Sequence, residues 1–265
     1  MTVLDAIRRP ATASTEYHGP AVALSGVTKR WSGEHGAPVL DGIDLEVARG
    51  EFVCLLGASG CGKSTLLSMI AGLEKPTEGT VDVQGGRAAL VFQEPALLPW
   101  LTAGQNVELA LRLRGAKKAQ RREESGRLLE LVRLGNARDK RVHELSGGMR
   151  QRVAIARALA QDSSVLLMDE PFAALDAITR DLLHEELTEL WAEVGLTVVF
   201  VTHNVREAVR LGQRVLLMSS RPGRIVREYA VDIAGPRRIE MPEVASLAVT
   251  ITDALREEIR RHAAH

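Results

Sequence analysis

Short apolar runs recur along the chain and predict strands that are buried on both faces of a parallel sheet. The four strongest runs are Phe52–Leu56, Val165–Met168, Thr197–Val201 and Val215–Met218. Shorter or alternating apolar segments predict four further strands, at Ala21–Thr28, Leu45–Val47, Thr80–Val83 and Ala88–Phe92. No apolar run reaches the roughly 18 residues that a membrane-spanning helix needs, so contact with a membrane would have to run through a partner.

Between these strands, the spacing of apolar and capping residues predicts helices. The first four expected helices are Ser64–Ala71, Gly104–Arg114, Ala119–Leu134 and one that is capped by Ser146 and runs to Ala160. A fifth covers Asp176–Val194. The stretch from about Glu94 to Ala160 is therefore mostly helical, and this helical block interrupts an alternating pattern of strands and helices.

The two ends of the chain differ from the rest. Met1–Gly19 lacks the apolar core of a signal peptide, and we expect a flexible tail there. Met241–His262 is polar with spaced apolar residues, which predicts an amphipathic helix. We expect this helix to pack on the surface of its own domain, although a regulatory contact is an open alternative.

Charge and cysteine usage narrow the range of partners and compartments. Lys and Arg together number 34, and so do Asp and Glu, so the formal net charge is zero. This balance argues against nucleic acid as the main partner, because binding to a phosphate backbone needs excess positive charge. The two cysteines, Cys54 and Cys61, suggest no disulfide framework, so we expect a reducing compartment.

A glycine-rich segment directly after Phe52–Leu56 fits the phosphate-binding loop pattern G-x-x-x-x-G-K-[ST]. Its residues are Gly57, Ala58, Ser59, Gly60, Cys61, Gly62, Lys63, Ser64 and Thr65. The glycines let the backbone curl so that successive N–H groups point at one phosphate, and the following helix adds the positive end of its dipole. We expect Lys63 to reach the β- and γ-phosphates of a nucleotide and Ser64 to ligate Mg²⁺.

Two carboxylates, Asp169 and Glu170, follow the apolar run Val165–Met168. In a phosphate-loop enzyme the first carboxylate holds the Mg²⁺ shell, so Asp169 is a candidate metal ligand. The second is placed to orient or activate an attacking water, which is the role expected of Glu170. The pair lies at the carboxyl end of a predicted sheet strand, where ligands bind in open α/β sheets.

The segment from Leu145 to Gln151 places Ser146, Gly147 and Gly148 at the start of a predicted helix. A hydroxyl, free N–H groups and a helix dipole form a second anion site there. One chain then carries two phosphate sites for one nucleotide, so the second could serve the γ-phosphate held by another copy. The segment resembles the signature sequence of ABC ATPases.

The resemblance covers about Ala21 to Arg227 and implies an α/β fold. It implies a P-loop NTPase core of mainly parallel sheet with flanking helices, an N-terminal antiparallel β subdomain and an inserted α-helical subdomain. The expected division is a tail at 1–19, an ATPase domain at 20–235 with the helical subdomain at about 94–160, and an amphipathic helical extension at 236–265. ATP and Mg²⁺ are the implied cofactors.

The resemblance also assigns roles to residues outside the loop. Gln93 resembles the glutamine that touches Mg²⁺ and senses the γ-phosphate, and Asp176 lies in a segment that resembles the D-loop of the dimer interface. His203 resembles the switch histidine that bonds the γ-phosphate, and Trp31 lies where an aromatic ring stacks on adenine. The catalytic set is then Glu170, His203, Gln93 and Lys63. Asn204 departs from the Asp that usually follows the switch histidine, but it can still cap the next helix.

An apolar loop from Glu94 to Trp100 could be a partner site or could pack inside the helical subdomain. The resemblance favours docking by a separate transmembrane permease. It implies further a second copy of the chain across two ATP sites and, indirectly, a substrate-binding protein. The implied location is the cytoplasmic face of the inner membrane, as a peripheral subunit. The residue sequences of this loop and of Pro222–Ile225 resemble those of the nitrate/sulfonate/taurine branch of ABC importers.

Two other functions stay open at this point. A soluble, non-transport ABC ATPase could act on ribosomes, DNA or cofactor assembly, but this chain has one phosphate loop and no visible coiled-coil insertion. A module that binds ATP without hydrolysing it is the other alternative. The presence of Asp169, Glu170 and His203 together argues against that module.

Overall fold

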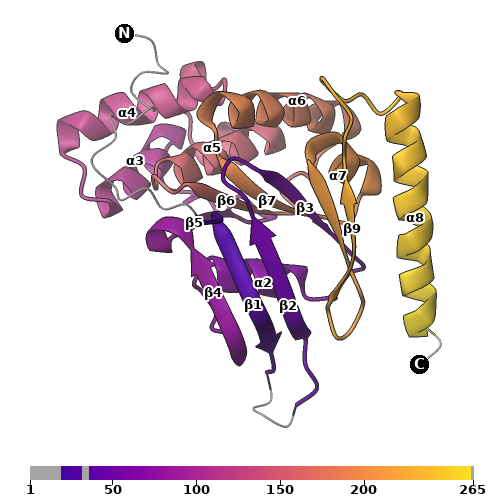
Figure 1. Ribbon diagram of the computed structural model, residues 1–265. Coiled ribbons are helices and arrows are strands. Elements are labelled where there is room, and N and C mark those ends of the chain that lie inside the picture. Colours follow the sequence, from indigo (N-terminus) through magenta and orange to yellow (C-terminus); the bar gives the residue numbers. More distant parts are fainter. Residues whose placement is uncertain (1–18, 32–35, 264–265) are drawn as a thin grey trace.

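A six-stranded sheet forms the centre of the molecule in the computed structural model, which describes residues 19–31 and 36–263 (Figure 1). Its order is β5-β6-β7-β3-β8-β9, parallel except for the antiparallel edge strand β9. The strands are β3 (Phe52–Leu56), β5 (Ala88–Val91), β6 (Val165–Asp169), β7 (Thr197–Thr202), β8 (Arg214–Met218) and β9 (Ile225–Ala230). The expected tail at 1–19 lies outside the described residues except for Gly19.

A second, antiparallel sheet lies against one face of the first, with the order β2-β1-β4. Its strands are β1 (Val22–Lys29), β2 (Leu40–Val47) and β4 (Glu78–Val83). Helix α2 (Lys63–Ile70) is packed between the two sheets, in one apolar cluster with Val53 and Leu55 of β3. Because successive strand residues point to opposite faces, Phe52, Cys54 and Leu56 belong to the cluster on the other face.

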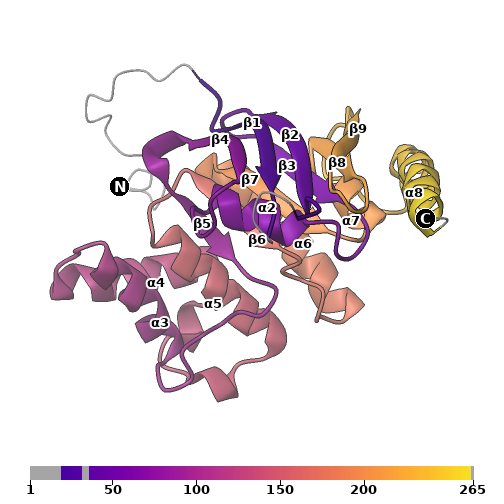
Figure 2. The same ribbon diagram turned by 90° about the horizontal axis from the view of Figure 1, so that it is seen from below.

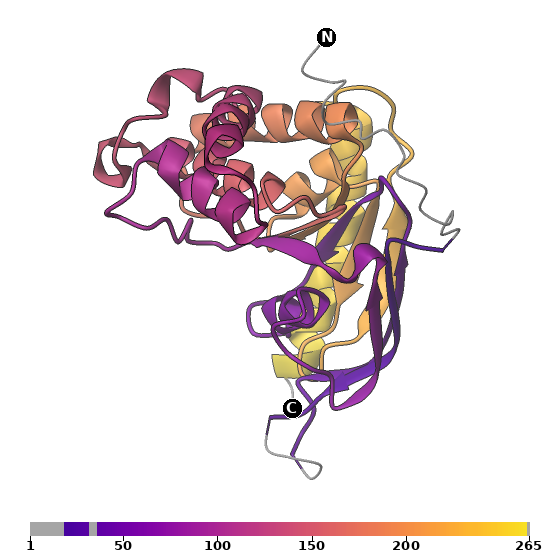
Figure 3. The same cartoon turned by 90° about the vertical axis from the view of Figure 1, so that its left-hand side faces the viewer.

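Helices cover that other face of the central sheet. They are α3 (Ala103–Leu113), α4 (Lys118–Leu131), α5 (Gly147–Leu159), α6 (Ala177–Val194) and α7 (Val205–Leu211). Short 3₁₀ turns lie at Gln84–Gly86, Gly135–Ala137 and Val142–Glu144. Figures 2 and 3 show α3 and α4 projecting away from the antiparallel sheet, which gives the molecule an L-shaped outline.

Helix α8 (Pro242–Ala263) runs along the outer edge of the molecule beside α7 and β9 (Figure 1). Its buried face carries Val244, Ala248, Ile251 and Ala254, which join the apolar cluster of α5, α6 and α7. The amphipathic helix expected from the sequence is therefore confirmed, and it packs on its own molecule. None of the helices in the described part of the chain combines the length and apolar character that a bilayer crossing requires.

Several predicted boundaries were wrong, each for a local reason. The alternating segment at Leu45–Val47 is only the end of β2, and Phe92 lies outside β5 with an exposed side chain. The helix expected over Ala119–Leu134 ends at Leu131, because Arg133 adopts a left-handed backbone with φ 58°. Strand β9 was not expected from the sequence, because it is mostly exposed and carries charged residues.

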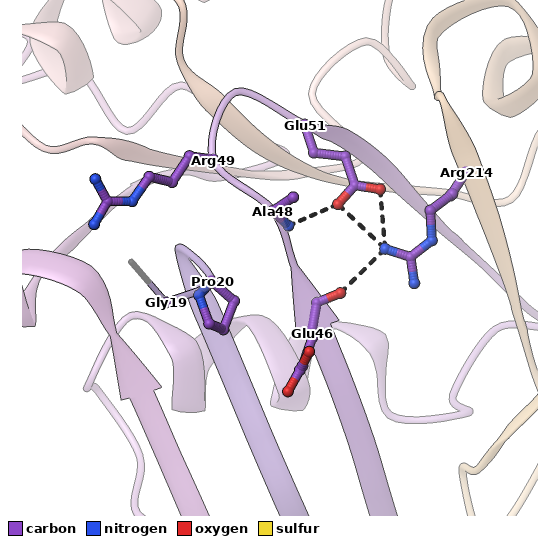
Figure 4. Close-up of a pocket in the computed structure, with 7 residues that line it drawn as sticks. All are labelled: Gly19, Pro20, Glu46, Ala48, Arg49, Glu51 and Arg214. Atoms are coloured by element: carbon purple, nitrogen blue, oxygen red, sulfur yellow. Dashed lines mark hydrogen bonds and ion pairs between the residues drawn. The ribbon is translucent and has the colours of Figure 1, made fainter. Parts of the chain in front are cut away.

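The arginine Arg214 fastens the edge of the central sheet to the start of β3 (Figure 4). Its Nη1 donates to both carboxylate oxygens of Glu51, at 2.9 and 3.2 Å, and to the carbonyl oxygen of Glu46 at 3.1 Å. Its Nε donates to Glu228 of β9 at 2.7 Å, and these hydrogen bonds raise the pKa of Arg214. Arg214 of β8 thus makes charge-assisted bonds to the edge strand β9 on one side and to Glu51, just before β3, on the other.

Candidate nucleotide-binding site

The glycine-rich loop from Gly57 to Gly62 joins β3 to α2, as its sequence pattern predicts. The Lys63 side chain is 5% exposed, and its Nζ donates to the carbonyl oxygens of Gly57 and Ala58 at 2.9 and 3.0 Å. Gly62 has φ 100°, and a Cβ there would lie 2.6 Å from Leu40 Cδ2. Only glycine fits such a position, so the tight path of the loop depends on it.

Cys61 fills the inside of this loop as a buried free thiol. Its Sγ would lie 2.8 Å from a Cβ at position 57, which explains the glycine there. Burial raises the pKa of the Cys61 thiol, and the nearby Lys63 ammonium lowers it in part. A protonated thiol is consistent with a packing role.

Ser64 and Asp169 face each other across α2 and the end of β6. The Ser64 hydroxyl lies near enough to the Asp169 carboxylate to lower its pKa. Burial raises the pKa of Asp169, and the neighbouring Glu170 raises it further, whereas Ser64 and Lys63 lower it. A hydroxyl and a carboxylate are the donors that Mg²⁺ uses together with phosphate oxygens, so these residues fit that ion. A cation there would stabilise the charge that burial disfavours.

Glu170 and His203 meet at the carboxyl ends of neighbouring strands β6 and β7. Glu170 Oε2 lies 2.8 Å from His203 Nδ1, and the exposed fractions of the two side chains are 22% and 63%. Glu170 has φ 44°, a left-handed backbone that costs a non-glycine residue about 1 kcal/mol or more. Strain of this kind clusters at functional sites, and here it aims a carboxylate at a partly exposed histidine.

The segment Ser146–Gly148 lies against α6. The Ser146 hydroxyl caps α5 by accepting the Met149 N–H at 3.3 Å. A Cβ at Gly148 would lie 2.7 Å from Thr179 Cγ2, and one at Gly147 would lie 3.1 Å from Leu175 Cδ2. Asp176 caps α6 by accepting the Thr179 N–H at 3.0 Å, and this bond lowers the pKa of Asp176. The N-terminal ends of α5 and α6 therefore pack against each other.

Trp31 and Gln93 are exposed at the ends of other elements. Trp31 follows β1 and is 58% exposed, with Lys29 Nζ 4.6 Å from its ring centroid. Gln93 lies two residues after β5. Among the described residues, neither of them hydrogen-bonds to the loop or to Asp169. The structure thus brings together Lys63, Ser64, Asp169, Glu170 and His203, and it leaves Trp31, Gln93 and the Ser146 segment apart from them.

The apolar loop from Glu94 to Trp100 combines both arrangements considered from the sequence. Leu97 packs against the apolar cluster, whereas Trp100 is 67% exposed. Arg157 of α5 donates to the carbonyl oxygens of Pro95 and Ala96, both at 2.7 Å. Ala96 has φ 45°, so these bonds hold a strained turn.

Three residues that contact the segments around the candidate site were not singled out from the sequence: Arg157, Arg180 and Lys29. Arg180 donates to the carbonyl oxygens of Phe172 and Leu175, at 3.3 and 2.7 Å, and so fixes the segment between Glu170 and Asp176. Lys29 stands over Trp31. Arg157 bonds to residues 61 and 62 positions away. Nothing in the local sequence pattern marks the Arg157 or Arg180 contact, because each is made to backbone carbonyls.

A phosphate loop after β3, an acidic pair after β6 and a capped helix carrying Ser146 define a nucleotide-binding cassette. The chain belongs to the ABC transporter family, whose sequence profile matches residues 40–173.

Individual relatives indicate which members of this family the chain is similar to. The nitrate import ATP-binding protein NrtD of Synechocystis sp. is 46% identical over 220 residues, which cover 80% of this chain and 83% of that one. The taurine import ATP-binding protein TauB of Mesorhizobium japonicum is 45% identical over 79% of this chain and 84% of its own. Among solved structures, the dimeric post-hydrolysis state of the ATP-binding cassette MJ0796 bound to ADP and Pi superposes with a TM-score of 0.69. It is 38% identical and matches 80% of this chain and all of that one.

Proposed function

We propose that this chain is the ATP-binding and ATP-hydrolysing subunit of an ABC importer for nitrate, a sulfonate, taurine or a similar small anion. The observation that carries hydrolysis is the Glu170–His203 contact of 2.8 Å, beside the Ser64–Asp169 pair. The substrate class is supported by relatives named for nitrate and taurine import. The substrate itself would not touch this subunit, so its identity rests on those relatives.

In the proposed site, the loop of residues 57–65 surrounds the phosphates of ATP, and Trp31 stacks on the adenine ring. Lys63 exchanges its two carbonyl partners for phosphate oxygens. Ser64, Asp169 and Gln93 hold Mg²⁺, which neutralises charge on the phosphates when bound. Glu170 orients the attacking water and accepts its proton, and His203 bonds the γ-phosphate. The partial exposure of His203 leaves its free ring nitrogen able to reach a ligand.

We also propose that the site is completed by a second copy of the chain. Ser146 and Gly148 lie at the start of α5, where a hydroxyl and free N–H groups suit a γ-phosphate. Within one copy they pack on α6. Dimeric cassettes with related sequences support an arrangement in which they close over the nucleotide of the partner. Asp176 would lie at the same interface.

Residues 20–235 form the ATPase domain in this proposal, with a helical subdomain at about 94–160 and an extension at 236–265. Permease helices dock at the exposed Trp100 on the apolar loop that Arg157 holds. The protein then works at the cytoplasmic face of the inner membrane, bound through that permease and served by a substrate-binding protein.

The role of Glu170 is tested by Glu170→Gln. The change keeps the shape and the contact with His203 but removes the base, so we expect MgATP binding to persist and turnover to fall by at least about 10²-fold. Steady-state phosphate release and nucleotide titration measure the two properties. The matched control is Glu193→Gln on the exposed face of α6, which should hydrolyse ATP at the rate of the native chain. Near-native turnover in Glu170→Gln would remove Glu170 from this role.

Co-purification tests the importer. Gentle extraction of tagged protein from native membranes, with Mg²⁺ and ATP present, should recover a multi-helix permease. The accompanying binding protein can then be titrated with nitrate, taurine and sulfonates. Recovery with ribosomes or assembly proteins, and only in the soluble fraction, would contradict the importer and support the non-transport alternative.

A further inference from the structure

We infer that the buried His184 is a positioning residue for hydrolysis, because it ties together the two segments that carry Glu170 and His203. The inference rests on the proposed function and concerns the same site. His184 lies on α6 and is 2% exposed. Its Nε2 lies 2.6 Å from Glu207 Oε1 of α7, and its ring meets Phe172 edge-on at a centroid distance of 5.4 Å. Phe172 follows Glu170 by two residues, and Glu207 follows His203 by four.

A chain of hydrogen bonds runs from His184 to both neighbours of His203. The Thr202 hydroxyl donates to Glu207 Oε2 and accepts the Asn204 N–H, the latter at 2.9 Å. Asn204 Oδ1 in turn accepts the N–H groups of Arg206 and Glu207, at 3.0 and 3.4 Å. The backbone on each side of His203 is therefore fixed through the Glu207 carboxylate. Since the His203 ring is mostly exposed, this backbone decides where the ring points.

The Glu207 carboxylate depends on these two donors. It is 7% exposed, and no Lys or Arg lies within ion-pair distance of it among the described residues. A buried carboxylate needs hydrogen bonds to remain in place, and His184 and Thr202 supply them. A carboxylate only accepts, so the His184 proton belongs on Nε2. Within the part of the chain that is described, His184 Nδ1 makes no hydrogen bond and lies 3.9 Å from Asp181 Oδ1, so the Nε2 contact is the one hydrogen bond of the ring.

Position 184 needs a hydrogen-bond donor to Glu207, which explains a histidine there, although a leucine would fill the same space. Removing the donor would leave the Glu207 carboxylate with Thr202 alone, so the carboxylate would turn or take up water. The Thr202–Asn204 bond would loosen, and His203 would lose its fixed approach to Glu170. ATP binding at the phosphate loop lies outside this chain of bonds. The effect should therefore fall on kcat and leave the KM for MgATP nearly unchanged.

The test compares His184→Leu with His184→Gln in the full-length chain. Gln can place an N–H group near the position of Nε2, whereas Leu cannot. We expect His184→Leu to lower kcat about tenfold or more with less than about a twofold change in KM, and His184→Gln to stay within about threefold of native kcat. Equal losses in the two variants, or native kcat in His184→Leu, would overturn the inference.

Hydrogen exchange separates this inference from the proposed hydrolysis. The amides of residues 203–207 should exchange about tenfold faster in His184→Leu and at native rates in His184→Gln, with α4 as an internal control. Unchanged exchange in His184→Leu would overturn the positioning role whether or not the chain hydrolyses ATP. A native chain that fails to hydrolyse ATP would instead contradict the proposed function. If His184→Leu does not fold, Thr202→Val and Thr202→Ser form the equivalent pair, and only Thr202→Val should show both losses.

Discussion

At the scale of single residues, the candidate site holds one carboxylate whose ionisation is disfavoured by burial and one residue with a strained backbone. Asp169 is held where burial raises its pKa, and Glu170 adopts a left-handed backbone beside it. Asp176, on the exposed start of α6, has the opposite environment, because the N–H and hydroxyl of Thr179 lower its pKa. When ionised, Asp169 should therefore lower the stability of the fold, and Asp176 should raise it.

Asp169→Asn and Asp176→Asn test those signs. A raised folded-state pKa means that ionised Asp169 destabilises the fold above that pKa, so Asp169→Asn should raise the Tm at pH 7 without divalent cations. The gain should shrink as the pH falls and Asp169 takes up a proton. A lowered pKa means that ionised Asp176 stabilises the fold, and that contribution is lost as the pH falls through its folded-state pKa. Asp176→Asn should therefore lower the Tm at pH 7 and have less effect in acid.

Thermal unfolding at several pH values in a chelating buffer measures both changes. The same sign for the two variants at pH 7 would contradict the electrostatic account of the site.

The residues that carry chemistry were predictable from the sequence where a motif fixes them along the chain. The Lys63–Ser64 pair lies where a helix was predicted to begin and the Asp169–Glu170 pair where a strand was predicted to end, and the structure places the two pairs together. Their roles in hydrolysis stay predictions. His184 was not predictable, because its partner lies 23 positions away on another helix and a lone histidine has no local pattern.

At the scale of elements, the start of α5 is held against the start of α6 by a contact that only glycine permits. A Cβ at Gly148 would lie 2.7 Å from Thr179 Cγ2. Thr179 is also the residue whose N–H and hydroxyl bond to Asp176. The orientation of the Ser146 segment is therefore linked to the segment that precedes α6.

Gly148→Ala should force the two helices apart and lower the free energy of unfolding by about 1–3 kcal/mol. Adding Thr179→Ser removes the clashing methyl group and keeps the hydroxyl, so the double variant should recover most of that loss. Gly126→Ala in α4 is the matched control, because no atom lies within 4 Å of its added Cβ. It should be neutral or should stabilise the protein by up to about 1 kcal/mol. Urea unfolding measures all three, and equal losses in Gly148→Ala and the double variant would contradict the steric account.

Strands buried on both faces could be predicted well, whereas the exposed edge strand β9 could not. The runs that became β3, β6, β7 and β8 are apolar because both faces of the central sheet are covered. β9 pairs on one side only and is held by the Arg214–Glu228 bond, so its sequence carries no apolar run. The C-terminal α8 was predictable because one face must pack on α7.

At the scale of the whole molecule, the L-shaped arrangement separates the two candidate phosphate sites. The loop of residues 57–65 belongs to the layer between the two sheets, whereas the Ser146 segment begins a helix on the other face. Figure 3 shows the projecting helices α3 and α4 at an angle to the antiparallel sheet. A single copy thus presents two candidate half-sites, and the proposed function requires that two copies complete each other.

The mass of the protein in solution, with and without ATP, tests whether two copies complete each other's site. Glu170→Gln should hold MgATP without hydrolysing it, so light scattering should give twice the chain mass of 28.8 kDa with MgATP and the single mass with MgADP. Adding Ser146→Arg, which places a bulky cation at the start of α5, should keep the protein at the single mass while nucleotide still binds. A Glu170→Gln protein that binds MgATP and stays at 28.8 kDa at all concentrations would contradict the shared site.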